Sequence, residues 1–172
     1  MSAATVLHTG VLRTMASATA FLLMFTATPA TAAETAKSEL HCLATAIYFE
    51  ARGESERGQR AIADVVIART KSGDHPDTIC GVVYEGAHHH GCQFSFACDG
   101  RSDVARDHKC WERAERIAAE AMEDDQSTVH NATYFHIRRI HPSWASHMTR
   151  VATIGAHIFY RPRHIPAIYA SR

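Results

Sequence analysis

The chain has 172 residues, enough for one domain with a substantial core and too few for two domains of ordinary size. Hydrophobic residues make up 46% and charged residues 21% of the chain, as is usual for globular proteins. Eighteen basic residues balance eighteen acidic residues, and this zero formal net charge argues against a general nucleic-acid-binding protein. The 13 histidines would add positive charge only in mildly acidic surroundings.

Residues 1–33 have the pattern of a secretory signal peptide. Residues 14–28 are mostly apolar and small, and residues 30–33 offer the small-x-small patterns that signal peptidase accepts. The alternative is a membrane anchor, but the dense apolar run at residues 21–25 is short for a membrane span. We therefore expect export to the periplasm or the extracellular cell wall, cleavage near Ala33 or Glu34, and no stable membrane insertion afterwards.

Export changes the interpretation of the five cysteines, because an oxidising compartment favours disulfides. Cys92 and Cys98 are the most natural local pair, and Cys42 with Cys80 is a candidate second bridge. Cys110 would then be left as a thiol. Spacing alone does not settle the connectivity.

The next segment predicts two helices joined by a short break. After a lead-in at residues 34–40, apolar residues recur at helical spacing, with Ser38 as the expected N-cap and Gly53 as the stop signal. Ser55 is expected to cap a second helix that ends at Ser72-Gly73. Helices joined by so short a connection should pack against each other.

Glycines and cysteines punctuate residues 74–107, which predicts an ordered loop region. A third amphipathic helix is expected at about residues 107–123. Residues 132–137 favour a strand, and residues 151–160 alternate as a second strand that would pair antiparallel with the first. Residues 163–172 are expected to be a loosely held tail. The sequence therefore predicts one α+β domain.

Glu50 is the first candidate for chemistry. It lies seven residues after Leu43 and three after Ile47, so it projects from the apolar face of the first helix. Burial there would raise its pKa and keep the acid protonated, as a general acid for glycosidic cleavage requires. The alternative is a helix-end glutamate that pairs with Arg52 or Arg57.

Glu54 follows the glycine break, where an acid is expected to cap or orient the second helix. A second catalytic carboxylate would have to come from one of four further acids, none of which stands out: Asp64, Asp74, Asp99 and Asp103. The cluster His88-His89-His90 beside Cys92 matches no zinc spacing, so a solvated loop is the better interpretation. We expect no metal and no cofactor.

Several motifs, in one order, resemble the SleB-like cell-wall hydrolases, a family that includes the spore-cortex-lytic enzymes. The matching segments lie between residues 41 and 160 and include residues 42–44, 47–55, 58–59, 65–69, 76–84, 92–100, 132–136, 142–144 and 154–160. The resemblance implies a lysozyme-like fold of the lytic transglycosylase type, with the catalytic domain at residues 41–162. It also implies an enzyme, expected as a monomer, that acts on peptidoglycan glycan strands.

By this resemblance Glu50 is the catalytic acid and base. It would protonate the oxygen that links N-acetylmuramic acid to N-acetylglucosamine, then take the proton of the muramic C6 hydroxyl to give a 1,6-anhydro product. The residues expected to contact the substrate are Glu54, Gln93, Phe94, Ser95, Tyr134 and His136. Core packing is the alternative for Phe94 and Tyr134. A hydrolytic muramidase, a non-catalytic peptidoglycan-binding protein and a metal-dependent wall amidase are the alternative functions.

Overall fold

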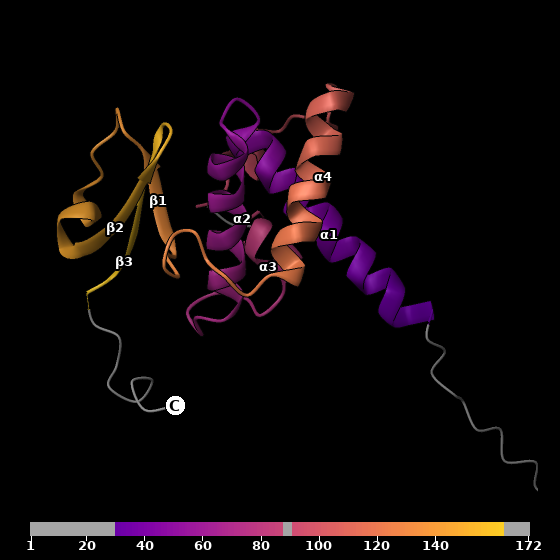
Figure 1. Ribbon diagram of the computed structural model, residues 1–172, viewed down its shortest axis with the longest axis horizontal. Coiled ribbons are helices and arrows are strands. Elements are labelled where there is room, and N and C mark those ends of the chain that lie inside the picture. Colours follow the sequence, from indigo (N-terminus) through magenta and orange to yellow (C-terminus); the bar gives the residue numbers. More distant parts are fainter. Residues whose placement is uncertain (1–29, 88–90, 164–172) are drawn as a thin grey trace, which may run out of the picture.

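The computed structural model describes residues 30–87 and 91–163, which form a helical part beside a small antiparallel sheet (Figure 1). The elements, in chain order, are α1 (Ala30–Ala51), α2 (Glu56–Thr70), α3 (Ile79–Val83), η1 (Ser95–Cys98), α4 (His108–Glu123), β1 (Tyr134–Ile137), η2 (Ser143–His147), β2 (Met148–Ile154) and β3 (His157–Pro162). This arrangement confirms the predicted α+β class.

The first helix begins earlier than expected. Residues 34–40, predicted as a lead-in, and Ser38, predicted as the N-cap, all lie inside α1. The physical reason is the alanine-rich composition of this segment, which has high helix propensity. Its residues 32–38 are exposed, and Figure 1 shows this end of α1 projecting from the body.

The expected signal peptide lies largely outside the described residues, so export stays a prediction. In the part of the chain that the structure describes, no helix combines the length and apolar character that a membrane span requires. The expected tail is likewise outside the description from residue 164 onward.

The helical core forms where the predicted apolar faces meet. Leu43 and Ile47 of α1 are completely buried and share a cluster with Val66 of α2 and Ile117 of α4. Asp107 caps α4 by accepting the backbone N–H of Cys110 at 3.0 Å. The expected third helix is therefore confirmed in position and in buried face.

Helix α2 is buried on two faces and joins the helical part to the sheet. Its Ser55 cap accepts the backbone N–H of Gly58, as the sequence predicted. Ile62 and Val65 face a second apolar cluster that contains Phe159 of β3. In Figure 1, α2 accordingly lies between the sheet and the other helices.

The sheet has the strand order β1-β3-β2, with β1 and β2 both antiparallel to β3. The antiparallel pairing of the first predicted strand with the second predicted segment is confirmed for its C-terminal part, which forms β3. The prediction of one strand over residues 151–160 is wrong, because the chain reverses at Gly155 and Ala156 between β2 and β3. Gly155 has a φ of 56°, a left-handed conformation that glycine adopts at little cost, as two-residue hairpin turns require.

Residues 74–107, expected as a loop region, contain the short helices α3 and η1. The Cys42–Cys80 disulfide ties α1 to α3, and the Cys92–Cys98 disulfide closes the loop that carries η1. Cys110 is a free thiol, as predicted. Residues 88–90, the histidine cluster, lie outside the described residues.

Candidate functional site

Glu50 lies in the last turn of α1, one residue before the helix ends at Ala51. It is half-buried, and its helical neighbours on the same face, Leu43 and Ile47, are completely buried. Burial raises the pKa of Glu50 above the ordinary value of 4.5, while the charge of Arg69 lowers it by a smaller amount. The carboxyl group is therefore held toward its protonated form.

The alternative role for Glu50, a helix-end ion pair, is wrong. Within the described residues the carboxyl group of Glu50 forms no ion pair with Arg52 or Arg57 and accepts no hydrogen bond. The Arg52 guanidinium instead lies over the ring of Tyr48, 5.2 Å from its centroid. An acid without a protein partner remains available to a ligand.

Two cavities meet at Glu50. One has a volume of about 450 Å³ and is lined by Glu50, Arg69, Gln93, Ser95, Tyr134, Phe135 and Trp144. The other has a volume of about 620 Å³ and lies between the end of α1 and the turns of the sheet, lined by residues 49–54, 137–139 and 156–157. Glu50 thus stands in the wall shared by two clefts, as a group that acts on an extended substrate would.

The structure brings most of the predicted contact residues to these cavities. Gln93, Ser95 and Tyr134 line the smaller cavity with Glu50, and Glu54 lines the larger one. Ser95 comes from the start of η1, Gln93 from the segment just before it, and Tyr134 from the start of β1. Residues far apart in sequence therefore converge on one acid.

The structure does not place Phe94 or His136 in the lining of the two cavities that Glu50 lines. Phe94 is 1% exposed and packs between Phe96 and Phe135, which fits its alternative role in the core. His136 is buried, with Nε2 hydrogen-bonded to the Tyr160 hydroxyl at 3.0 Å and Nδ1 to the carbonyl of Ile137.

Glu54 holds the turn between β2 and β3. Its two carboxylate oxygens accept the backbone N–H of Ala156 at 3.3 and 3.2 Å. The same carboxylate fills the space in which a side chain on Gly155 would lie. These contacts agree with the orienting role predicted for Glu54.

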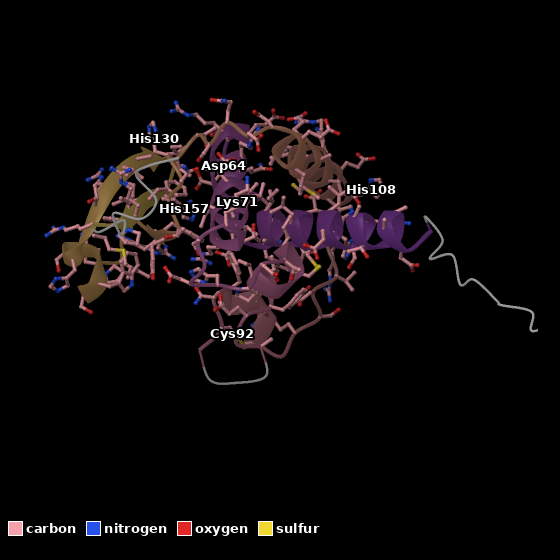
Figure 2. All side chains as sticks on the ribbon, turned by 90° about the horizontal axis from the view of Figure 1, so that it is seen from below. Asp64, Lys71, Cys92, His108, His130 and His157 are labelled. Atoms are coloured by element: carbon pink, nitrogen blue, oxygen red, sulfur yellow. A yellow bond between two sulfur atoms is a disulfide. The ribbon has the colours of Figure 1, made fainter. Side chains whose placement is uncertain are left out.

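His157 lies beside this contact, where the sheet meets the helical part (Figure 2). Its Nδ1 is 4.0 Å from Glu54 Oε1 and has no hydrogen-bond partner among the described residues. Burial lowers the pKa of His157, and the nearby Glu54 carboxylate opposes that change. Burial therefore favours the neutral imidazole beside the turn.

Arg69 is a site residue that the sequence interpretation missed. It is 4% exposed, donates from Nε to the Thr133 carbonyl at 2.8 Å, and lies over the rings of Phe94 and Phe135. Its Nη1 has no hydrogen-bond partner among the described residues. This buried cation faces the same cavity as Glu50 and favours the carboxylate form of that acid.

The other acids have different surroundings. Asp64, labelled in Figure 2, is buried on α2 and bonds Arg60 and Thr128, so its role is structural. Asp99 and Asp103 line a third cavity of about 390 Å³, which Glu50 does not line. Within residues 30–87 and 91–163, no group of three or more His, Cys, Asp or Glu side chains is placed to hold a metal ion.

A family model described as Cell Wall Hydrolase matches residues 53–160. Among curated proteins, the chain is 30% identical over 122 residues to a spore cortex-lytic enzyme of Halalkalibacterium halodurans, covering 71% of this chain and 34% of that protein. It is 28% identical over 123 residues to a spore cortex-lytic enzyme of Bacillus cereus, covering 72% of this chain and 44% of that protein. The chain therefore spans less than half the length of these relatives.

Among solved structures, the fold is similar to the catalytic domain of the germination-specific lytic transglycosylase SleB from Bacillus anthracis. That match has a TM-score of 0.61 and 26% identity, and it covers 73% of this chain and 95% of the other. The catalytic domain of the Bacillus cereus SleB protein gives a TM-score of 0.60 at 26% identity, covering 73% of this chain and 91% of the other. The expected lysozyme-like fold of the lytic transglycosylase type is borne out by these matches.

Proposed function

Because this chain belongs to the cell wall hydrolase family, we propose that it cleaves the bond between N-acetylmuramic acid and N-acetylglucosamine in peptidoglycan, with Glu50 as the catalytic residue. The observation that carries the proposal is the position of Glu50, a half-buried and unpaired acid between two cavities. A protonated carboxyl group beside apolar walls is the group that glycosidic cleavage requires.

In the first step, Glu50 donates its proton to the glycosidic oxygen as the bond to C1 of the muramic residue breaks. Burial raises the pKa of Glu50 and so favours the protonated form that this step requires. Once the proton has left, the Arg69 guanidinium stabilises the carboxylate that remains. Gln93, Ser95 and Tyr134 line the cavity on this side and supply polar contacts to the sugar.

In the second step, the Glu50 carboxylate takes the proton of the muramic C6 hydroxyl, and that oxygen attacks C1 to close a 1,6-anhydro ring. Reuse of one group as acid and then base follows the logic of retaining glycosidases. Hydrolysis is the second candidate, since a water could attack C1 in place of the C6 hydroxyl.

Digestion of purified sacculi tests the proposal. We expect the mature protein to release anhydro-muropeptides, identified by mass, and Glu50→Gln to release none. Reducing ends at muramic acid would establish a hydrolytic muramidase, and free stem peptides would establish an amidase. Full activity of Glu50→Gln would remove Glu50 from the mechanism, and binding without products from either protein would indicate a non-catalytic peptidoglycan-binding protein.

The proposal includes export, with a signal peptide at residues 1–33 and a catalytic domain at residues 41–162. Cleavage near Ala33 or Glu34 would fall in the exposed first turns of α1, so the buried part of that helix would be unaffected. N-terminal sequencing of the protein recovered from periplasm or medium tests this expectation. An intact N-terminus on membrane-bound protein would instead indicate an anchor.

A further inference from the structure

Three arginines line the larger cavity beside Glu50. Arg52 follows the last turn of α1, and Arg138 and Arg139 form the turn that follows β1 on the opposite wall. All three residues are exposed, and the Arg52 guanidinium packs over the Tyr48 ring. This leaves Arg138 and Arg139 as the arginines whose guanidinium groups no other described side chain binds. We call these three residues the arginine cluster.

The backbone around the arginine cluster is fixed, although its side chains have no acidic partners. The Arg138 N–H donates to the Ala156 carbonyl at 2.8 Å, and the Ile140 N–H closes the turn on the Ile137 carbonyl at 3.0 Å. In the described part of the chain, no guanidinium of the cluster forms an ion pair or a side-chain hydrogen bond. The arginines are therefore presented to the cavity without a protein carboxylate to neutralise them.

The cavity has two acids of its own. Burial holds Glu50 toward the neutral form, and the Glu54 carboxylate accepts the Ala156 N–H and forms no ion pair with an arginine of the cluster. The smaller cavity on the other side of Glu50 differs, because it offers the uncharged Gln93, Ser95 and Tyr134 besides the buried Arg69. The two sides of Glu50 are thus suited to different parts of a substrate.

Resting on the proposed function, the chemistry of peptidoglycan identifies the ligand of the arginine cluster. The N-acetylated sugars of an intact strand carry no charge, and the lactyl group of a substituted muramic residue is tied up in an amide. The carboxylates of the substrate are those of the stem peptide, and the planar guanidinium of arginine binds carboxylates in a bidentate manner. We propose that the arginine cluster binds stem-peptide carboxylates, so that the enzyme prefers glycan strands whose muramic residues carry acidic stems.

Sacculi with and without stem carboxylates test this inference. Sacculi freed of wall teichoic acid are divided, and one half is treated with a water-soluble carbodiimide and excess ammonium chloride, which converts carboxylates to carboxamides. Below saturation, we expect the wild type to release muropeptides about tenfold more slowly from the carboxamide sacculi than from the untreated sacculi. This factor corresponds to the loss of one charge-assisted hydrogen bond. Arg138→Gln/Arg139→Gln should lose this preference and process both substrates at similar rates.

The matched control is Arg57→Gln/Arg161→Gln, which removes two exposed arginines from α2 and β3 and should keep the preference. Retention of the preference by Arg138→Gln/Arg139→Gln, or an equal loss on both substrates, would overturn the inference. Thermal melting confirms that each variant is folded.

Binding to both kinds of sacculi, measured in the Glu50→Gln background, keeps the test independent of catalysis. Carboxylate-dependent binding that disappears with Arg138→Gln/Arg139→Gln supports the inference even if Glu50 is not the catalytic acid. Equal binding to both sacculi by the Glu50→Gln protein overturns it, while leaving the role of Glu50 to the product analysis.

Discussion

Substitution of Gly155 by alanine tests the contact between Glu54 and the turn of the sheet. The residue has a φ of 56°, where an L-amino acid costs about 1 kcal/mol. A Cβ on this glycine would also overlap Glu54 Oε2, so the carboxylate must leave its place. Loss of its charge-assisted bond to the Ala156 N–H costs roughly 2 kcal/mol more. Gly155→Ala should therefore lower the free energy of unfolding by about 3 kcal/mol.

Two matched proteins separate these contributions. Gly73 has a φ of 79° and open space around its Cα, so Gly73→Ala should show the backbone cost of about 1 kcal/mol alone. In the Glu54→Ala background the overlap is gone, and Gly155→Ala should also cost only about 1 kcal/mol there.

Urea denaturation of the four variants and the wild type measures the effect, provided that the slope with denaturant stays constant. The rate of muropeptide release should fall with Gly155→Ala, because the displaced turn forms a wall of the larger cavity. Equal costs for Gly155→Ala with and without Glu54 would refute the view that Glu54 supports the turn. The Glu54 carboxylate would then be free to act on the substrate.

Glu50→Gln should raise the free energy of unfolding at neutral pH and leave it unchanged well below pH 4.5, as measured by urea denaturation across pH. Burial raises the pKa of Glu50 in the folded protein, so ionisation opposes folding as the pH rises above the ordinary value of 4.5. Arg69→Met should move the falling alkaline limb of the pH–rate profile to higher pH, since removal of this positive charge raises the pKa of Glu50 further, whereas Arg69→Lys keeps the charge and the limb. Cys42→Ser/Cys80→Ser should cost about 4 kcal/mol of unfolding free energy under oxidising conditions, the chain-entropy value for a sequence separation of 38, and an unchanged urea midpoint would count against this disulfide.

The sequence predicted the parts of the fold that depend on local signals. Ser55 and Asp107 cap the helices expected there, because a capping side chain acts within one turn of the chain. The two errors in the predicted elements also have local causes. The alanine-rich segment before Ser38 contains no residue that prevents a helix, so α1 begins before the predicted cap. The reversal at Gly155 interrupts an alternation of side chains that otherwise continues into the next strand.

The site residues that could be predicted are those whose burial follows from helical spacing. Glu50 follows Leu43 by seven residues and Ile47 by three, and the same rule applies to Arg69, seven residues after Ile62 and three after Val66. Applied to basic as well as acidic residues, the rule would have found Arg69.

His136 shows what spacing cannot report. It shares a face of β1 with Tyr134, yet it is buried, with Nε2 hydrogen-bonded to the Tyr160 hydroxyl, whereas Tyr134 lines the smaller cavity. Tyr160 comes from β3, whose pairing with β1 depends on tertiary structure. Arg138 and Arg139 lie in an exposed turn, where no periodic pattern distinguishes a binding residue from an ordinary surface residue.

The two glutamates that flank the break after α1 show how one short segment creates two different acids. Glu50 still belongs to the helix, so its side chain is directed along a buried face and loses solvation without gaining a hydrogen bond. Glu54 lies beyond Gly53, where its backbone N–H bonds the Ala51 carbonyl and its side chain reaches the Ala156 N–H. The first environment favours a proton donor and the second a fixed carboxylate. In the proposed reaction, Glu50 is therefore the group that carries the proton, and Glu54 holds the turn that walls the larger cavity beside it.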